Sequence, residues 1–300
     1  MKLAAMLEQL LTEQPYAPSS ELHRLTTTQC LELMNRADSD VPAAVAKEIP
    51  AIARAVDAIS SALQNGGKLF YIGSGTSGRL GVLDAAECPA TFHAPPELVQ
   101  AIIAGGDVAL RRSVEAAEDD PAAGARDLID AGFSKNDALA AISASGRTPY
   151  VLGAVAEARR LGALTCGLSC TANSELSRAV DYPIAPLCGP EILTGSTRLK
   201  AGTASKLVLN MISTAVMVKL GAVYGNLMVN VEPSNSKLED RARRIIEQVA
   251  GVSFERASEL LEQGGRNVRT AIVMGKKGVP RQQAEELLAR AGGRLGEALG

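Results

Sequence analysis

The sequence predicts an α/β fold in which a five-stranded parallel sheet is covered by helices on both faces, followed by a small all-helical C-terminal domain. Short apolar runs alternate with helical patterns between residues 68 and 187, which is typical of buried parallel strands joined by helices. Hydrophobic residues make up 46% of the chain and aromatic residues only 3%. The core is therefore expected to consist of Ala, Leu, Val and Ile, as suits helices packed on a sheet.

Each strand is predicted from a short apolar run. The runs are residues 68–73, 98–106, 136–146, 163–170 and 182–187, the third of which is longer than the strand that it contains. Helical patterns separate them, at residues 78–86, 109–131, 149–161 and 175–178, and the connections should be right-handed. A long apolar helical stretch, 198–224, follows the last strand.

The chain divides into three predicted parts. Residues 1–50 form an N-terminal helical segment that starts with a short amphipathic helix and not a signal peptide. Residues 51–236 form the sheet domain, of which 225–236 resemble a linker. Residues 237–300 form three or four small helices, because glycines interrupt the pattern near residues 251, 264, 275 and 292.

Composition argues against several classes of protein. A net charge of −2 and few aromatic residues do not favour nucleic-acid binding or an anionic membrane surface. We find no apolar run as long as a membrane span of about 18 residues. Five cysteines are an odd number, so a disulfide framework is not expected and the cytoplasm is the expected compartment. No metal site is expected, because the two histidines are far apart and no zinc-ligand spacing occurs.

The first chemical motif is YIGSGTSGRLG, residues 71–81, where a predicted strand enters a helix. Glycines let backbone N–H groups approach an anion, hydroxyl groups add donors, and the helix N-terminus adds partial positive charge. The spacing matches neither the dinucleotide fingerprint nor the nucleoside-triphosphate loop, so a phosphomonoester is the expected ligand. A plain strand-to-helix turn is the alternative. The candidate contacts are Ser74, Thr76, Ser77, Gly78 and Arg79.

The second motif, ISASGRTPYV at residues 142–151, has the same character. Loops that follow parallel strands meet at the carboxyl edge of the sheet, where ligands bind in this architecture. Two such loops together favour a phosphate site more strongly than either alone. Arg147 either contacts the phosphate or supports the loop. The candidate contacts are Ser143, Ser145, Gly146, Arg147 and Thr148.

Other polar residues are ambiguous from the sequence. Glu87, Glu115 and Glu118 lie in predicted helices, where isolated acids are usually solvated, and the pattern does not single out any of them. Asp84, Asp119 and Asp120 are expected on the surface. Lys200 precedes the long apolar helix, either as ordinary surface charge near an N-cap or in a loop that closes on a phosphate.

Taken together, four segments closely resemble the N-acetylmuramic acid 6-phosphate etherases of the sugar isomerase (SIS) superfamily. They are YIGSGTSGRLGVLDAAECPATF, IAGGDVALRRSVEAAEDD, SASGRTPYV and LTGSTRLKAGTASKLVLNM, and the resemblance runs from about residue 20 to the C-terminus. It implies a five-stranded αβα sandwich, a homodimer, no cofactor, and the catalytic residues Glu87 and Glu118. The family often has Ala or Cys at Ser74 and Ser at Ala86, neither of which changes the charge.

The implied reaction removes D-lactate from C3 of the phosphosugar by elimination and water addition, with Glu118 as the base at C2 and Glu87 as the acid at the lactyl oxygen. A phosphosugar isomerase would need an acid–base pair but no ether cleavage. A sugar-phosphate sensor, such as the glucokinase regulatory protein, would bind the same ligand without turnover. These two readings are the alternatives.

Overall fold

The computed structural model describes residues 11–300; the amphipathic helix expected at the start of the chain lies largely outside the described residues. The chain forms two compact units. The first, called here the sheet unit, comprises Met1–Ala85 and Glu97–Ser213. The second, the helical unit, comprises Ala86–Pro96 and Thr214–Gly300.

The sheet unit contains the predicted five-stranded parallel sheet, in the order β2-β1-β3-β4-β5. Four strands have five residues each and β5 has three, and the residues of β1 and β3 are all buried. The strands are β1 Leu69–Gly73, β2 Val99–Ile103, β3 Ala138–Ile142, β4 Leu164–Leu168 and β5 Tyr182–Ile184. Every strand lies within an apolar run that predicts it.

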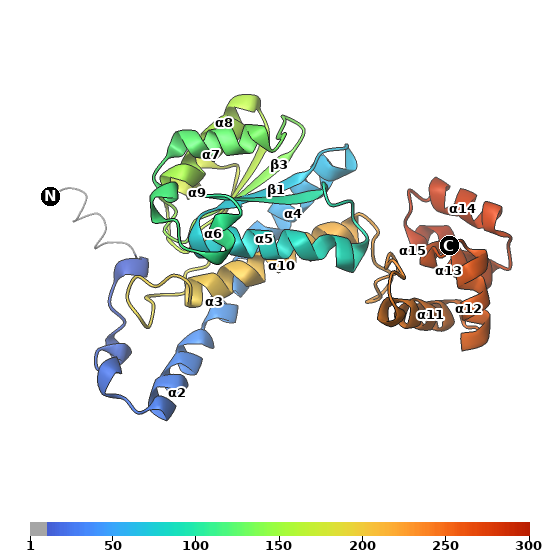
Figure 1. The fold of residues 1–300 in the computed structure, drawn as a ribbon, viewed down its shortest axis with the longest axis horizontal. Helices are drawn as coiled ribbons and strands as arrows, with labels where there is room; N and C mark the ends of the chain where they lie inside the picture. Colours follow the sequence, from blue (N-terminus) through green and yellow to red (C-terminus); the bar gives the residue numbers. More distant parts are fainter. Residues whose placement is uncertain (1–10) are drawn as a thin grey trace. The chain divides into compact units, whose positions relative to one another are not determined.

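Helices cover both faces of the sheet (Figure 1). On one face, α7 (Pro121–Asp130), α8 (Pro149–Leu161) and α9 (Glu175–Ala179) pack on a cluster that includes Phe70 and Leu139. On the other face lie α4 (Ile49–Gln64) and the parts of α5 (Gly75–Phe92) and α10 (Lys200–Lys219) that belong to the sheet unit. The αβα sandwich is therefore confirmed.

The region expected as one helix over 109–131 is broken into three pieces. They are α6 (Val108–Arg111), the 3₁₀ turn η4 (Glu115–Glu118) and α7. Arg112 is extended, and the Asp120 carboxylate accepts a hydrogen bond from the N–H of Ala123 at 3.0 Å, with Pro121 in the first turn. This cap starts a new helix at Pro121, so Glu118 lies on a short turn and not within a helix.

Asp84 is not a surface residue, contrary to expectation. Only 6% of it is exposed, and its carboxylate accepts hydrogen bonds from Tyr71 Oη at 2.9 Å and Ser213 Oγ at 3.1 Å. Asn210 Nδ2 donates to it at 2.5 Å. Asp84 is buried because α5 lies between the sheet, which contributes Tyr71, and α10, which contributes Asn210 and Ser213.

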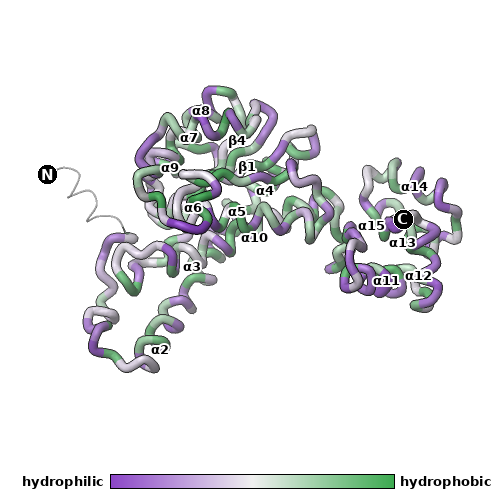
Figure 2. Tube along the Cα trace, in the orientation of Figure 1, coloured by the Kyte–Doolittle hydropathy of each residue, from purple (hydrophilic) through white to green (hydrophobic). Residues whose placement is uncertain are grey.

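The helical unit contains five helices after residue 235 in the part of the chain that the structure describes, one more than the three or four expected. The four predicted breaks, near residues 251, 264, 275 and 292, separate these five helices, of which the last is short. Val229 and Val231, from the stretch expected as a linker, are buried in the core of this cluster. Figure 2 shows α11 largely in the colour of hydrophilic residues, as its charged sequence requires. The helices are α11 Ser236–Ala250, α12 Phe254–Gln263, α13 Val268–Lys277, α14 Arg281–Arg290 and α15 Leu295–Leu299.

The N-terminal segment is helical with breaks, as expected. Three 3₁₀ turns precede α2 (Thr27–Asp38) and α3 (Val41–Lys47). All five cysteines are free thiols, and burial raises the pKa of Cys166 to about 12. Among residues 11–300, one helix, α10, has the length and apolar composition of a membrane span. The core helix of a soluble protein also passes this test, and 56% of the most apolar stretch of α10 is buried.

Candidate functional site

The two hydroxyl-rich loops follow adjacent strands. Gly73, the last residue of β1, is paired with Ile142, the last residue of β3. Ser74 and Ser143 therefore leave the same edge of the sheet from neighbouring positions. The predicted meeting of the two loops at the carboxyl edge is confirmed by this register.

The first loop is tight because its glycines allow close backbone contact. A Cβ atom on Gly73 would lie 2.7 Å from the nitrogen of Gly78, and one on Gly78 would lie 2.6 Å from the oxygen of Gly73. The helix begins at Gly75, which has a positive φ of 52°, so the loop residues form the first turn of α5. The N–H groups of that turn have no partner within the helix, which makes it suited to an anion.

The second loop is held by its own hydroxyl groups. Ser143 Oγ lies 2.8 Å from Thr148 Oγ1 and 3.5 Å from Ser145 Oγ, and it accepts a hydrogen bond from the N–H of Gly146 at 3.1 Å. Gly146 has a φ of 67°. Ser145 and Thr148 are partly exposed, whereas Ser143 is buried, so the first two are better placed to meet a ligand.

Arg147 supports the second loop. Its guanidinium forms an ion pair with Glu175 of α9 at 3.3 Å, and 19% of its side chain is exposed. Of the two roles that the sequence allows, this contact favours loop support over direct contact with phosphate.

Glu118 lies beside the first loop. Ser74 Oγ donates a hydrogen bond to Glu118 Oε2 at 3.1 Å. Both residues line a cavity of about 160 Å³ at the mouth of the loop. The remaining lining residues are Gly75, Arg79, Ala104, Ala109, Ser113 and Val114. The structure thus brings one of the two predicted glutamates to the predicted phosphate loop.

Arg79 orders the wall of this cavity. Its Nε donates to the carbonyl of Leu110 at 3.3 Å and its Nη2 to that of Arg112 at 3.2 Å. These bonds tie α5 to the segment that leads into η4. Ser113 also lines the cavity, although no sequence pattern around it distinguishes it from other serines.

Glu87, Thr76 and Ser77 do not line this cavity. Glu87 lies on α5 just beyond the division between the units, in the helical unit, and is exposed. The methyl group of Thr76 faces α10, where a Cβ on Gly202 would lie 3.5 Å from it. Ser77 is half-buried in the first turn of α5.

Lys200 is buried, with 3% of the residue exposed. Its Nζ donates to the carbonyl of Pro190 at 3.0 Å and lies 5.3 Å from the centre of the Tyr16 ring. The Glu191 carboxylate accepts from the N–H groups of Lys200 and Ala201 at 3.0 and 2.9 Å and so caps α10. In this arrangement Lys200 holds the segment before α10, and it does not line the cavity beside Ser74.

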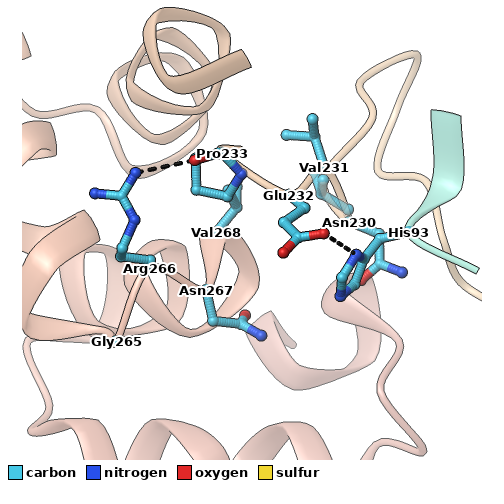
Figure 3. A pocket seen from close by; sticks show the side chains of 10 residues that line it. His93, Asn230, Val231, Glu232, Pro233, Gly265, Arg266, Asn267 and Val268 are labelled. Atoms are coloured by element: carbon cyan, nitrogen blue, oxygen red, sulfur yellow. Dashed lines mark hydrogen bonds and ion pairs between the residues drawn. The ribbon is translucent and has the colours of Figure 1, made fainter. Parts of the chain in front are cut away.

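A second cavity, of about 270 Å³, lies within the helical unit (Figure 3). His93 Nδ1 is 3.3 Å from Glu232 Oε2, and Arg266 donates to the carbonyl of Pro233 at 3.0 Å. Arg266 is also paired with Glu239 and Glu262. Its charge is therefore already compensated, which does not favour a phosphate there. Among residues 11–300, no group of His, Cys, Asp or Glu is placed to hold a metal ion.

The sandwich and its two hydroxyl-lined loops define a SIS-type α/β protein. Residues 51–159 match the family model described as the glucokinase regulatory protein N-terminal SIS domain. The fold is also that of a phosphoheptose isomerase from Neisseria gonorrhoeae, with a TM-score of 0.50 at 18% identity over 64% of this chain and 98% of that one.

Sequence relatives identify the family within this class. The N-acetylmuramic acid 6-phosphate etherase of a Synechococcus species is 52% identical over 97% of this chain and 92% of its own. That of Caldanaerobacter subterraneus is 48% identical over 98% and 96%. The chain belongs to the N-acetylmuramic acid 6-phosphate etherase family.

Proposed function

We propose that this protein cleaves the C3 D-lactyl ether of N-acetylmuramic acid 6-phosphate and releases N-acetylglucosamine 6-phosphate and D-lactate. It is a carbon–oxygen lyase by family. The main structural support for this proposal is the hydrogen bond between Ser74, in the first loop, and Glu118. The turn that we propose to bind phosphate is thus adjacent to a carboxylate, as a proton transfer on a bound phosphosugar requires.

The chemistry needs a base and an acid. An ether oxygen is a poor leaving group, so direct displacement is slow. Opening the pyranose to its aldehyde places the C2 proton next to a carbonyl, where a carboxylate can remove it. Lactate then leaves from C3 as its oxygen is protonated, and water adds to the resulting α,β-unsaturated aldehyde. General acid–base groups typically contribute about 10²–10⁴-fold each.

In our proposal Glu118 is the base at C2 and Glu87 is the acid at the lactyl oxygen. The position of Glu118 beside Ser74 supports its assignment. The assignment of Glu87 rests on the family resemblance of the AAEC segment. Thr76, Ser77, Ser145 and Thr148 are proposed to hold the 6-phosphate, with Ser143 ordering the second loop from within.

We further propose that the enzyme acts as a homodimer in the cytoplasm. Glu87 and Glu118 are both exposed in the single chain, whereas proton transfer of this kind benefits from the exclusion of water. Exposed apolar side chains also favour an interface: Leu83 is 52% exposed, and Val108, which precedes the cavity-lining Ala109, is 63% exposed. Five free thiols suit a reducing compartment. Sedimentation equilibrium tests the dimer, and a sedimenting mass of a single chain would contradict it.

The decisive experiment is incubation with N-acetylmuramic acid 6-phosphate in ¹⁸O-labelled water and, separately, in D₂O. We expect ¹⁸O at C3 of the product, unlabelled D-lactate, and deuterium at C2. Glu118→Gln should lower kcat by about 10²-fold or more and slow the C2 exchange. Glu97→Gln, an exposed acid outside the cavity, is the matched control. Exchange without released lactate would indicate an isomerase, and tight binding without either would indicate a sensor.

A further inference from the structure

A cavity of about 430 Å³ lies beside β5, the edge strand of the sheet. The end of α3, the first turns of α4, the segment after β4, α9 and the residues around β5 line it. It shares no lining residue with the cavity beside Ser74. Three of its lining side chains are cationic: Lys47, Arg54 and Arg178.

These cations are only slightly compensated. Within residues 11–300, the side chains of Lys47 and Arg54 form no hydrogen bond or ion pair, and Arg178 donates to the carbonyl of Asn173. Glu48 is the one acidic lining residue, and its carboxylate accepts a hydrogen bond from the N–H of Ala185 at 3.0 Å. Three positive charges against one negative leave a surplus of two. Like charges that share a cavity repel one another, and a bound anion removes that repulsion.

Neutral hydrogen-bond donors accompany the charges. The Ser177 hydroxyl lines the cavity and lies 2.9 Å from Ser174 Oγ, and the Asn173 amide lines it from a residue with a φ of 50°. Guanidinium groups present a planar fork of donors that matches the oxygens of a phosphate. The combination of two arginines, a lysine, a hydroxyl and an amide is the donor set of a phosphate site.

We propose that this cavity binds a small phosphomonoester at a site separate from the etherase centre. The phosphate group carries about −1.5 to −2 charges near pH 7, which matches the surplus of two. The volume lies within the range of small-molecule sites, so there is room for a sugar-sized body beside the phosphate. This binding does not depend on the proposed reaction.

The bound phosphomonoester would contact α9, the helix that is hydrogen-bonded to the second loop. The N–H of Leu176, in α9, donates to the carbonyl of Gly146 at 2.9 Å, and Glu175 pairs with Arg147. Ser177 and Arg178, which follow directly in α9, line the cavity. Binding at the β5 edge therefore reaches the 143–148 loop through one five-residue helix.

Isothermal titration with glucose 6-phosphate tests the proposal in a Ser77→Ala/Ser145→Ala background, which weakens the candidate active site. We expect one equivalent bound per chain, and about tenfold or more loss of affinity when Arg54→Ala and Arg178→Ala are added. The matched control adds Arg36→Ala and Arg290→Ala, which remove the same charge from exposed positions and should leave affinity within twofold. Circular dichroism confirms that each variant is folded.

Three results would overturn the proposal. The first is no glucose 6-phosphate bound in the background variant. The second is an equal loss of affinity in the Arg36/Arg290 control, which would indicate non-specific attraction. The third is binding of inorganic phosphate but not of glucose 6-phosphate, which would reject a phosphomonoester as the ligand. Titration with glucose, which lacks the phosphate, should give no heat of binding at this site.

Discussion

Gly146 shows how one residue sets the shape of the second phosphate loop. It has a φ of 67°, and a Cβ atom there would lie 2.3 Å from the side chain of Ser174. Both the backbone conformation and the lack of space require glycine. The carbonyl of Gly146 also accepts the N–H of Leu176, so the loop is fixed to α9 at this point.

We expect Gly146→Ala to lower the free energy of unfolding by more than the roughly 1–2 kcal/mol that the left-handed conformation alone costs a non-glycine residue, and to raise KM. Gly132→Ala is the control, because Gly132 has a φ of 78° but nothing within 4 Å of its Cβ position. Urea unfolding of the two variants separates strain from clash. Equal losses in both would contradict a role for the contact with Ser174.

Asp84 provides a second test at this scale. Asp84→Leu removes the charged acceptor shared by Tyr71, Asn210 and Ser213 from a buried network, so we expect a loss of about 2–4 kcal/mol in the free energy of unfolding. Asp119→Leu, at an exposed neighbour of the Glu118 turn, should change it by less than about 0.5 kcal/mol. Chemical denaturation measures both, and a similar small loss for each would show that the buried network contributes little.

Individual residues differ in how far the sequence predicts them. The loop glycines and hydroxyls are recognisable because they follow apolar strands directly, and their local geometry depends on near neighbours. Asp84 and Lys200 are not, because their burial depends on which segments cover α5 and the start of α10. Those partners are up to 129 residues away in the chain for Asp84, and no local pattern contains them.

At the scale of elements, the start of α7 depends on Asp120. The N–H of Ala123 is the main cause that lowers the pKa of the Asp120 carboxyl below its ordinary value of 3.8, with Arg126 contributing. Folding therefore favours the ionised Asp120 carboxylate. Its contribution to the stability of the folded protein is complete above the ordinary pKa and is lost as the pH falls through the lowered pKa of the folded state.

We therefore expect the Tm of Asp120→Asn to be lower than that of the unmodified protein near pH 6, and the difference to shrink below about pH 4. Asparagine retains the cap but not the charge. Thermal unfolding followed by circular dichroism between pH 3 and 6 measures the difference. A difference that is constant over this range would contradict the role of the charge.

The break between α6 and α7 shows that helical periodicity alone does not predict where a helix is interrupted. The residues over 109–131 favour helix throughout, but Asp120 followed by Pro121 is an N-cap signal within that stretch. Recognising this signal would place Glu118 before the cap, on the turn where the structure has it. The strands are more predictable, since each is a short and mainly apolar run between polar loops.

At the scale of the molecule, the core of the helical unit includes residues that precede its first C-terminal helix, α11. Val229 is fully buried and Val231 is 3% exposed in the core formed by α11–α15. A fragment of residues 225–300 should therefore unfold cooperatively at a higher temperature than one of residues 237–300, which lacks both side chains and about 1.5–3 kcal/mol of burial for each. Calorimetry of the two fragments decides this, and equal transitions would show that the valines do not stabilise the cluster.

The helical unit is discontinuous in the chain, and this has a consequence for synthesis on the ribosome. Asn230 donates to the carbonyl of Phe92 across 138 residues of sequence, and His93 pairs with Glu232. The Ala86–Pro96 segment emerges early and finds these partners only after the intervening residues of the sheet unit, Glu97–Ser213, have been translated. Such long-range closure slows folding, so completion of this unit is expected to follow the synthesis of the sheet unit.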